Sequence, residues 1–231
     1  MRINKYLAHC GIASRRKSEE IILDGRITIN NEVMTDLSYS VTNKDIVEID
    51  GNRIKVPKFQ EYYILHKPKG YICSSKDELG RKNITELIKT KERIYSVGRL
   101  DKDTTGLIIL TNDGDFTNRL LHPKYRITRK YYAYTKEMLS PKQVEKIKRG
   151  IFLRKGERVQ ADIKHIEFTK GKHKWRVILK EGKNREIRRI FHRFDLKVYN
   201  LHRYAFGKLT LKGIDRGNYK KIINLDINSI I

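Results

Sequence analysis

The feature that most limits the fold of this chain is its longest wholly aliphatic run near the middle, Leu-Ile-Ile-Leu at residues 107–110. Four residues are far fewer than the roughly 20 that an apolar helix needs to span a bilayer. With Gly106 before it and Thr111 after it, the run has the length of a core strand. The N-terminus has no apolar h-region, so we expect a cytoplasmic protein with no membrane contact.

Other segments with regular apolar spacing lie on both sides of this run. Strands are expected at 62–65, 71–74, 93–97, 106–111, 131–135, 163–168 and 175–179. Helices are expected at 83–89, 114–121, 141–149 and 185–194, with Ser140 as a cap and Pro141 at the first helical position. Many strands with few helices between them predict an α+β domain around a mixed, mostly antiparallel sheet.

The first 56 residues follow a different pattern and are interpreted as a small domain. Apolar residues at helical spacing end at Gly11, and a second helix begins after Ser14 and ends at Gly25. Alternating apolar residues and turn residues then predict a few short strands. A linker is expected at 57–60, where Pro57 falls in a segment without periodicity, and a larger domain at 61–231.

The charge of the chain indicates a polyanionic partner. Lys and Arg number 51 against 27 Asp and Glu, a formal charge of +24, and 39% hydrophobic residues are enough to fill a core. Charge on this scale opposes compaction unless a partner offsets it, so nucleic acid is the leading candidate. A basic solvated surface without a partner is the alternative.

Several classes of site lack their usual motifs. The sequence has no GxGxxG or GxxxxGK[ST] phosphate loop and no GxSxG serine setting, which disfavours kinases, ATPases, dehydrogenases and serine hydrolases. Two cysteines are too few for a disulfide framework, and the seven histidines show no HxxxH or HExxH spacing. No metal site is expected.

The N-terminal segment carries a recognisable pattern. MRINKYL at 1–7, GIASRRKSEE at 11–20 and DGRITIN at 24–30 resemble the S4 domain, an RNA-binding module found in a ribosomal protein and in several RNA-modifying enzymes. The resemblance spans the whole small domain. It implies that Arg15, Arg16, Lys17 and Arg26 contact RNA, whereas the charge run alone fits a solvated face equally well.

The segment 97–112 places an acidic loop between two apolar strands. Gly98 and Gly106 bracket the loop, and a loop mounted on a rigid sheet is a natural position for a catalytic side chain. The alternative is an Asp-rich turn whose side chains bond their own backbone. GRLD at 98–101, followed by TTGL at 104–107, resembles the signature of the pseudouridine synthase family, in the branch of enzymes that modify ribosomal RNA of either subunit.

Other segments support this resemblance in order along the chain. They are KPKGY at 67–71, KY at 130–131 and EGKNREIRR at 181–189, while LHPKY at 121–125 and YAF at 204–206 are most similar to large-subunit members of the family. With the S4 domain, the resemblance covers essentially the whole chain. It implies isomerisation of uridine to pseudouridine in ribosomal RNA, by a carboxylate acting at C1′ of a flipped nucleotide, without a cofactor.

The resemblance also assigns the catalytic residues. Asp101 matches the family's carboxylate, which either attacks C1′ or takes a proton from the sugar. Tyr131 matches the active-site tyrosine, although it could instead pack in the core; strand alternation places Tyr132 and Tyr134 on the opposite face. Arg188 matches the basic partner that keeps the carboxylate ionised.

The remaining basic residues of these motifs are expected to contact RNA, and they are Lys67, Arg99, Lys130, Arg185 and Arg189. The expected partner is ribosomal RNA or an assembly intermediate of a ribosomal subunit. We expect a monomer, because one bound RNA suffices. Two alternatives stay open: a non-catalytic S4-type RNA-binding or ribosome-assembly protein, and another RNA enzyme such as a methyltransferase.

Overall fold

The computed structural model describes residues 1–74, 79–153, 156–223, 228 and 230. The chain divides into two compact units. One comprises Met1–Glu61, Thr90–Ile94 and Asn112–Gly114, and the other comprises the rest of the chain. The two short later pieces of the first unit were not expected from the sequence. Residues 54–61 form no helix or strand, and a domain boundary at 57–60 remains a proposal.

The first unit has two helices and a small antiparallel sheet, as the N-terminal pattern predicts. Its helices are α1 (Ile3–His9) and α2 (Arg15–Leu23), and the Ser14 hydroxyl accepts a hydrogen bond from the Lys17 N–H at 3.4 Å. Its strands, in the order β2-β1-β3-β4, are β1 (Ile27–Ile29), β2 (Glu32–Val33), β3 (Val47–Ile49) and β4 (Asn52–Arg53). Apolar side chains of both helices pack with β1 and β3 into one core.

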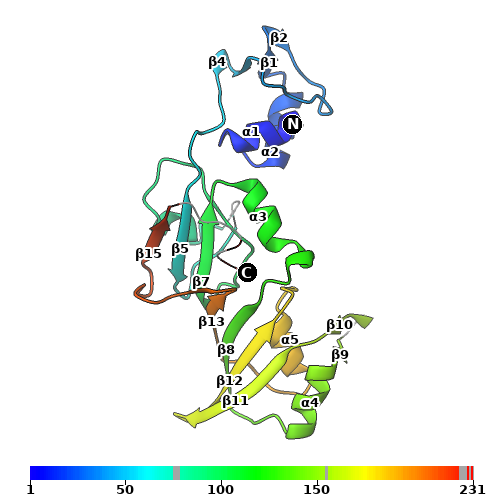
Figure 1. The fold of residues 1–231 in the computed structure, drawn as a ribbon, viewed down its shortest axis with the longest axis vertical. Helices are drawn as coiled ribbons and strands as arrows, with labels where there is room; N and C mark the ends of the chain where they lie inside the picture. Colours follow the sequence, from blue (N-terminus) through cyan, green and yellow to red (C-terminus); the bar gives the residue numbers. More distant parts are fainter. Residues whose placement is uncertain (75–78, 154–155, 224–227, 229, 231) are drawn as a thin grey trace. The chain divides into compact units, whose positions relative to one another are not determined.

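The second unit is built on a mixed sheet with the strand order β11-β12-β8-β13-β7-β5-β15 (Figure 1). Its strands are β5 (Tyr62–Lys67), β7 (Thr104–Thr111), β8 (Arg129–Thr135), β11 (Asp162–Thr169), β12 (Lys172–Leu179), β13 (Asn200–Phe206) and β15 (Tyr219–Ile222), with β6 (Tyr95–Ser96) beside β7 and β14 (Leu209–Thr210) beside β13. Among the described strands, β13 and β7 form the one parallel pair. The strands β9 (Ile151–Phe152) and β10 (Arg158–Val159) pair antiparallel in a separate two-stranded sheet.

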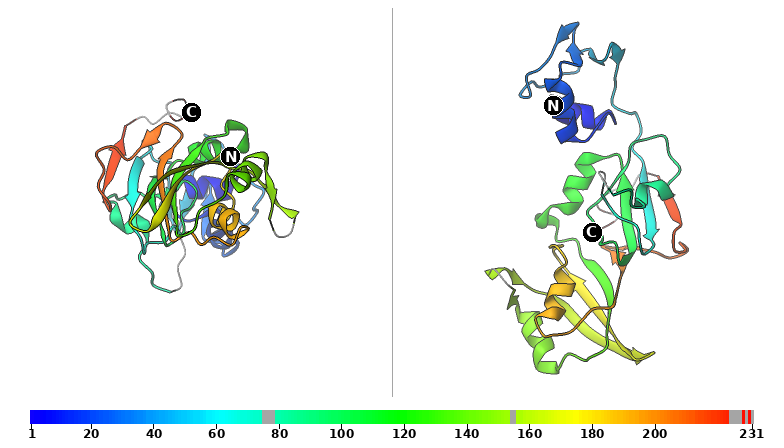
Figure 2. Two further views of the ribbon diagram at one scale, coloured as in Figure 1. Left: turned by 90° about the horizontal axis from the view of Figure 1, so that it is seen from below. Right: turned by 180° about the vertical axis from the view of Figure 1, so that it is seen from behind.

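Helices cover selected faces of this sheet. The helix α3 (Gly114–Leu121) packs Phe116 and Leu120 into a core with Leu107 and Ile109 of β7. The helix α5 (Glu186–His192) packs against β12 through a ring contact between Phe191 and Trp175, with centroids 6.0 Å apart. The helix α4 (Pro141–Arg149) lies beside β11, and short 3-10 turns form η1 (Ile84–Leu87) and η2 (Pro123–Tyr125). Figure 2 shows α5 in front of β12 when the molecule is seen from behind.

Most expected elements are confirmed, and the differences have local causes. The helices at 114–121 and 141–149 match α3 and α4 residue for residue. The strand expected at 71–74 is wrong: only Ile72 bridges, to Asn83, because its backbone bonds to residues 82–84. The helix expected at 83–89 is only the turn η1. The central strand β13 was not predicted.

A half-buried histidine in β13 makes folding stability depend on pH. The pKa of His202 is lowered to about 4, mainly by burial and then by the nearby His66 and Arg216 charges. Because the unfolded chain takes up a proton near pH 6.5 and the folded chain does not, stability falls as the pH drops from about 6.5 towards 4. Discounted for partial exposure, acidification from pH 7 to 5 should cost roughly 1 kcal/mol, or about 2–4 °C in Tm.

The comparison of His202→Gln with wild type tests whether His202 causes this pH dependence of stability. The variant should lose most of the decrease in Tm between pH 7 and 5, whereas His192→Gln, at an exposed position of α5, should keep it. An unchanged slope in His202→Gln would assign the acid sensitivity to other groups.

Candidate active site

The predicted catalytic carboxylate, Asp101, lies in the loop between β6 and β7. The backbone of the loop turns so that the Thr104 N–H donates to the Asp101 carbonyl at 3.0 Å. The Asp101 side chain is 30% exposed and lines a cavity of about 120 Å³. The carboxylate is therefore accessible from solvent while its backbone is fixed.

Lys67 stabilises the backbone of this loop through hydrogen bonds. Its side chain has no exposed surface, and its ammonium donates to the carbonyls of Pro68 at 3.0 Å, Lys102 at 3.3 Å and Thr104 at 2.9 Å. The Gly70 N–H also donates to the Lys102 carbonyl. Burial lowers the pKa of Lys67. The expectation that Lys67 contacts RNA is thus wrong, because all three N–H bonds are used inside the protein.

Replacement of Lys67 with methionine should therefore damage both stability and activity. The variant leaves three carbonyls of the loop without their donor, at about 1–3 kcal/mol for each buried group that water cannot reach. A loosened Asp101 should lower kcat by about tenfold or more. Urea unfolding and an assay of the uridine isomerisation expected from the sequence measure the two effects.

The matched control is Lys69→Met, two residues away in the sequence and exposed. It should leave the free energy of unfolding unchanged. Equal stability of Lys67→Met and wild type would contradict the role of the buried ammonium.

Two arginines face Asp101 from the segment that begins α5. Arg185 Nη1 donates to Asp101 Oδ2 at 3.2 Å, and Arg188 Nε lies 3.8 Å from the same oxygen. Arg188 is more deeply buried, and its Nη1 donates to the Val198 carbonyl at 2.7 Å. Burial lowers the pKa of Arg188, and the Arg185 charge adds to this effect while Asp101 opposes it.

Both arginines thus lie beside the carboxylate, whereas the sequence predicted only Arg188 as its basic partner. Arg185, expected to bind phosphate, makes the direct hydrogen bond to the carboxylate. It also has a left-handed backbone (φ 47°, ψ 33°), a conformation that non-glycine residues adopt rarely and that occurs often at functional sites. The guanidinium pair keeps the carboxylate oriented towards the cavity.

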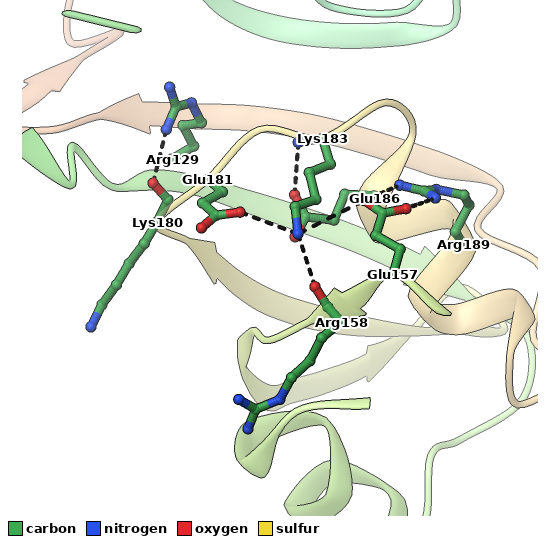
Figure 3. A network of polar contacts seen from close by, with 8 residues as sticks. All are labelled: Arg129, Glu157, Arg158, Lys180, Glu181, Lys183, Glu186 and Arg189. Carbon is green, nitrogen blue, oxygen red and sulfur yellow. Dashed lines mark hydrogen bonds and ion pairs between the residues drawn. The ribbon is translucent and has the colours of Figure 1, made fainter. Parts of the chain in front are cut away.

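Figure 3 shows how the loop that carries Arg185 is anchored. At its start, Arg129 Nη1 donates to the Lys180 carbonyl at 3.2 Å. At its end, the buried Glu186 carboxylate accepts the Lys183 N–H at 2.9 Å, and burial raises the pKa of Glu186. The Lys183 ammonium donates to the Arg158 carbonyl at 2.8 Å. Both ends of the loop are therefore fixed, and Arg185 is held between them.

The walls of the cavity combine apolar and cationic side chains. Tyr131 is 7% exposed and lines the cavity together with Leu201 and Phe206. Arg129 and Arg203 are also buried in the wall, and Arg203 Nε donates to the Leu107 carbonyl at 2.7 Å. Neither arginine was expected at the site from the sequence. Arg129 lies two residues before Tyr131, so strand alternation could have placed it on the same face. Arg203 lies in β13, the strand that was not predicted from the sequence.

The lining of the cavity carries an excess of positive charge. The cationic side chains are Arg99, Arg129, Lys183, Arg185 and Arg203, and the acidic ones are Asp101 and Glu186. A cavity with this balance favours an anionic ligand or a reaction in which negative charge develops.

The other residues expected to contact RNA occupy three kinds of position. Arg99 is exposed at the cavity. Arg189 is ion-paired with Glu157, so it supports the loop instead of standing free for phosphate. Lys130 alternates with Tyr131 along β8 and thus lies on the other face of the strand.

In the first unit, the four expected RNA contacts are all at the surface. Arg15 and Arg16 are exposed in the first turn of α2, where Lys17 pairs with Glu20 at 2.6 Å. Arg26 forms two hydrogen bonds with Asp50, at 2.5 and 3.0 Å. Exposed pairs of this kind are weak and can exchange for phosphate.

Neither a metal cluster nor a membrane-spanning helix occurs in the described part of the chain. Within the described ranges, no three His, Cys, Asp or Glu side chains gather closely enough to bind a metal ion. None of the helices formed by described residues has the length and apolar character needed to cross a membrane.

Comparison with known proteins gives the family. The profile of RNA pseudouridylate synthases matches residues 61–193, and that of the S4 domain matches residues 1–47. Ribosomal large subunit pseudouridine synthase B of Bacillus subtilis (strain 168) is 39% identical over 225 residues, which cover 96% of this chain and 91% of that protein. An uncharacterised RNA pseudouridine synthase of Aquifex aeolicus (strain VF5) is 38% identical and covers 96% and 90%.

A solved structure supports the same fold. The chain resembles a crystal structure of a pseudouridylate synthase with a TM-score of 0.72 and 24% identity, over 100% of both chains. With the profile match across more than half of the chain, these similarities establish the relationship: the chain belongs to the RNA pseudouridine synthase family and carries an S4 domain in its N-terminal part.

Proposed function

We propose that this protein isomerises a specific uridine of large-subunit ribosomal RNA to pseudouridine, with Asp101 as the catalytic carboxylate. One observation carries the assignment of the site: the Asp101 carboxylate lies at the cavity, hydrogen-bonded by Arg185 and 3.8 Å from Arg188. The assignment of the RNA rests on similarity to the large-subunit enzyme of Bacillus subtilis.

The reaction conserves all atoms of the nucleotide. The bond from C1′ to N1 breaks, the base turns, and C1′ bonds to C5, while the proton of C5 is lost and N1 gains one. Asp101 can act as a nucleophile at C1′ or as a base towards the sugar, and both roles need an ionised carboxylate. The guanidiniums of Arg185 and Arg188 hold the carboxylate in place through a hydrogen bond and a close charge contact.

The detached uracil carries negative charge while it turns. Arg129 and Arg203, buried in the cavity wall, supply fixed positive charge that stabilises this anion without reorganisation of water. Tyr131 stacks on the base and relays the proton that leaves C5.

Entry of the uridine needs a flipped nucleotide, at a cost of a few kcal/mol. Phosphate contacts offset that cost, and we assign them to Arg99 at the cavity and to Arg15, Arg16, Lys17 and Arg26 of the S4 domain. The proposed enzyme is a cytoplasmic monomer that acts on ribosomal RNA or on an assembly intermediate of a ribosomal subunit.

The test uses transcripts of the large and small ribosomal RNAs with tritium at C5 of uridine. The proposed enzyme releases tritium to water from the large transcript, and mapping of the product locates one or a few pseudouridines. Release only from the small transcript would place the substrate in the small ribosomal RNA. Binding without release from either transcript would favour an S4-type RNA-binding protein.

A further inference from the structure

A patch of tyrosines and lysines lies on the sheet face that α5 does not cover. In β12, β8 and β13, the side chains of Trp175, Ala133 and Leu201 are buried, and Trp175 contacts α5. Strand alternation places Lys174 and Arg176 of β12 on the opposite face. In Figure 1, β11 and β12 lie in front of α5, and Figure 2 shows the reverse order from behind, so α5 covers one face only.

The centre of this patch is a pair of stacked tyrosines. The rings of Tyr132 and Tyr204 have centroids 4.3 Å apart and planes inclined by 19°. The Lys174 ammonium lies 4.7 Å from the Tyr132 ring, and both tyrosines are half-buried. A half-exposed stacked pair with a cation beside it is an arrangement on which nucleic-acid bases stack.

Arg176 adds an unsatisfied donor to the same face. It pairs with Tyr132 across the β12–β8 ladder, and its guanidinium lies 3.6 Å from Asp162. Its buried Nε–H has no hydrogen-bond acceptor among the described residues. Lys130, two residues before Tyr132, extends the positive charge along β8 on this face.

A third tyrosine, at the end of the same strands, has three lysines around its ring. Tyr199 donates its backbone N–H to the Tyr134 carbonyl, and the ammonium groups of Lys136, Lys172 and Lys197 lie 5.4, 5.8 and 5.4 Å from its ring. None of these lysines forms an ion pair with a described acidic residue. Three like charges around one ring repel each other unless an anion lies among them.

We propose that this face, which we call the tyrosine–lysine face (Lys130, Tyr132, Lys136, Lys172, Lys174, Arg176, Lys197, Tyr199 and Tyr204), is a second binding site for single-stranded RNA. Bases stack against the Tyr132–Tyr204 pair, and phosphates lie among the lysines around Tyr199. Open sheet faces with aromatic residues bind single strands in this way in other RNA-binding folds. The site is distinct from the catalytic cavity and needs no turnover.

The test uses a fluorescein-labelled oligoadenylate of about twelve nucleotides. This probe contains no uridine and is therefore no substrate. Tyr132→Leu with Tyr204→Leu should weaken binding of the full-length protein about tenfold or more, because each stacked base contributes substantially to affinity. Tyr219→Leu, a half-buried tyrosine of the edge strand β15, is the matched control and should bind like wild type.

A charge variant tests the phosphate contacts separately from the stacked tyrosines. Lys172→Gln with Lys197→Gln should lower the slope of log affinity against log salt by about 1.4, or 0.7 for each phosphate contact of a single strand. Equal affinity of the double tyrosine variant and Tyr219→Leu, with thermal unfolding of both near wild type, would overturn the proposal. An unchanged salt slope in the lysine variant would also overturn it. Neither outcome depends on tritium release, so the proposed isomerase activity is judged separately.

Discussion

Asp101→Asn is expected to lower tritium release from C5-labelled uridine by at least about 1,000-fold. Asparagine keeps the shape of the side chain and can still accept the hydrogen bond from Arg185. It has no negative charge to attack C1′ or to accept a proton from the sugar, so both chemical roles of the carboxylate are lost. Single-turnover assays with excess enzyme measure the chemical step without product release.

The same variant should bind RNA nearly as well as wild type, because the phosphate contacts lie on other side chains. Asp103→Asn is the control, since Asp103 is an exposed acid of the same loop and should retain activity within a few-fold. If Asp103→Asn lost release while Asp101→Asn kept it, the catalytic carboxylate would have to be reassigned.

Gly106→Ala is expected to have a large effect on folding. Gly106 pairs with Arg203 at the parallel junction of β7 and β13 and has φ of 117°. A Cβ there would lie 2.6 Å from the Arg203 nitrogen and closer still to its carbonyl oxygen. Because these are backbone atoms, the two strands must separate, at a cost of about 3 kcal/mol or more. Tm should fall by about 6–12 °C.

Activity should fall with stability in Gly106→Ala, because β7 carries the Asp101 loop and β13 carries Arg203. Gly213→Ala separates the backbone effect from the steric one. Gly213 also has a positive φ of 72°, but a Cβ there has no atom within 4 Å. This control should cost only about 1 kcal/mol, from backbone conformation alone. A similar Tm for both variants would show that the close approach of β7 and β13 is not rigid.

Features that depend on neighbouring residues could be read from the sequence. Ser14 caps α2, and Ser140 caps α4 with Gln143 in a capping box, since these contacts span three residues. Alternation along β8 separated Tyr131 from Tyr132 without knowledge of the partner strands. The acidic loop before β7 was located by its flanking glycines and apolar run.

Features that depend on contacts between residues far apart in the chain could not be read from the sequence. β13 escaped prediction because Arg203 occupies one of its inward positions, and because a register shift after Arg203 interrupts its pairing with β8. The buried Arg203 guanidinium is stabilised there because its Nε–H donates to the Leu107 carbonyl, 96 residues away in the sequence. In the same way, Lys67 is a surface residue by composition and a buried anchor in the structure.

The sequence by itself determined the α+β class, the two helices of the small domain and the loop that carries Asp101, because apolar spacing and capping act over a few residues. Only the tertiary structure decided which cations face the carboxylate and which support its loop. Burial and hydrogen-bond partners are set by strands far apart in the chain, and they turned Lys67 inward and placed Arg185 on Asp101.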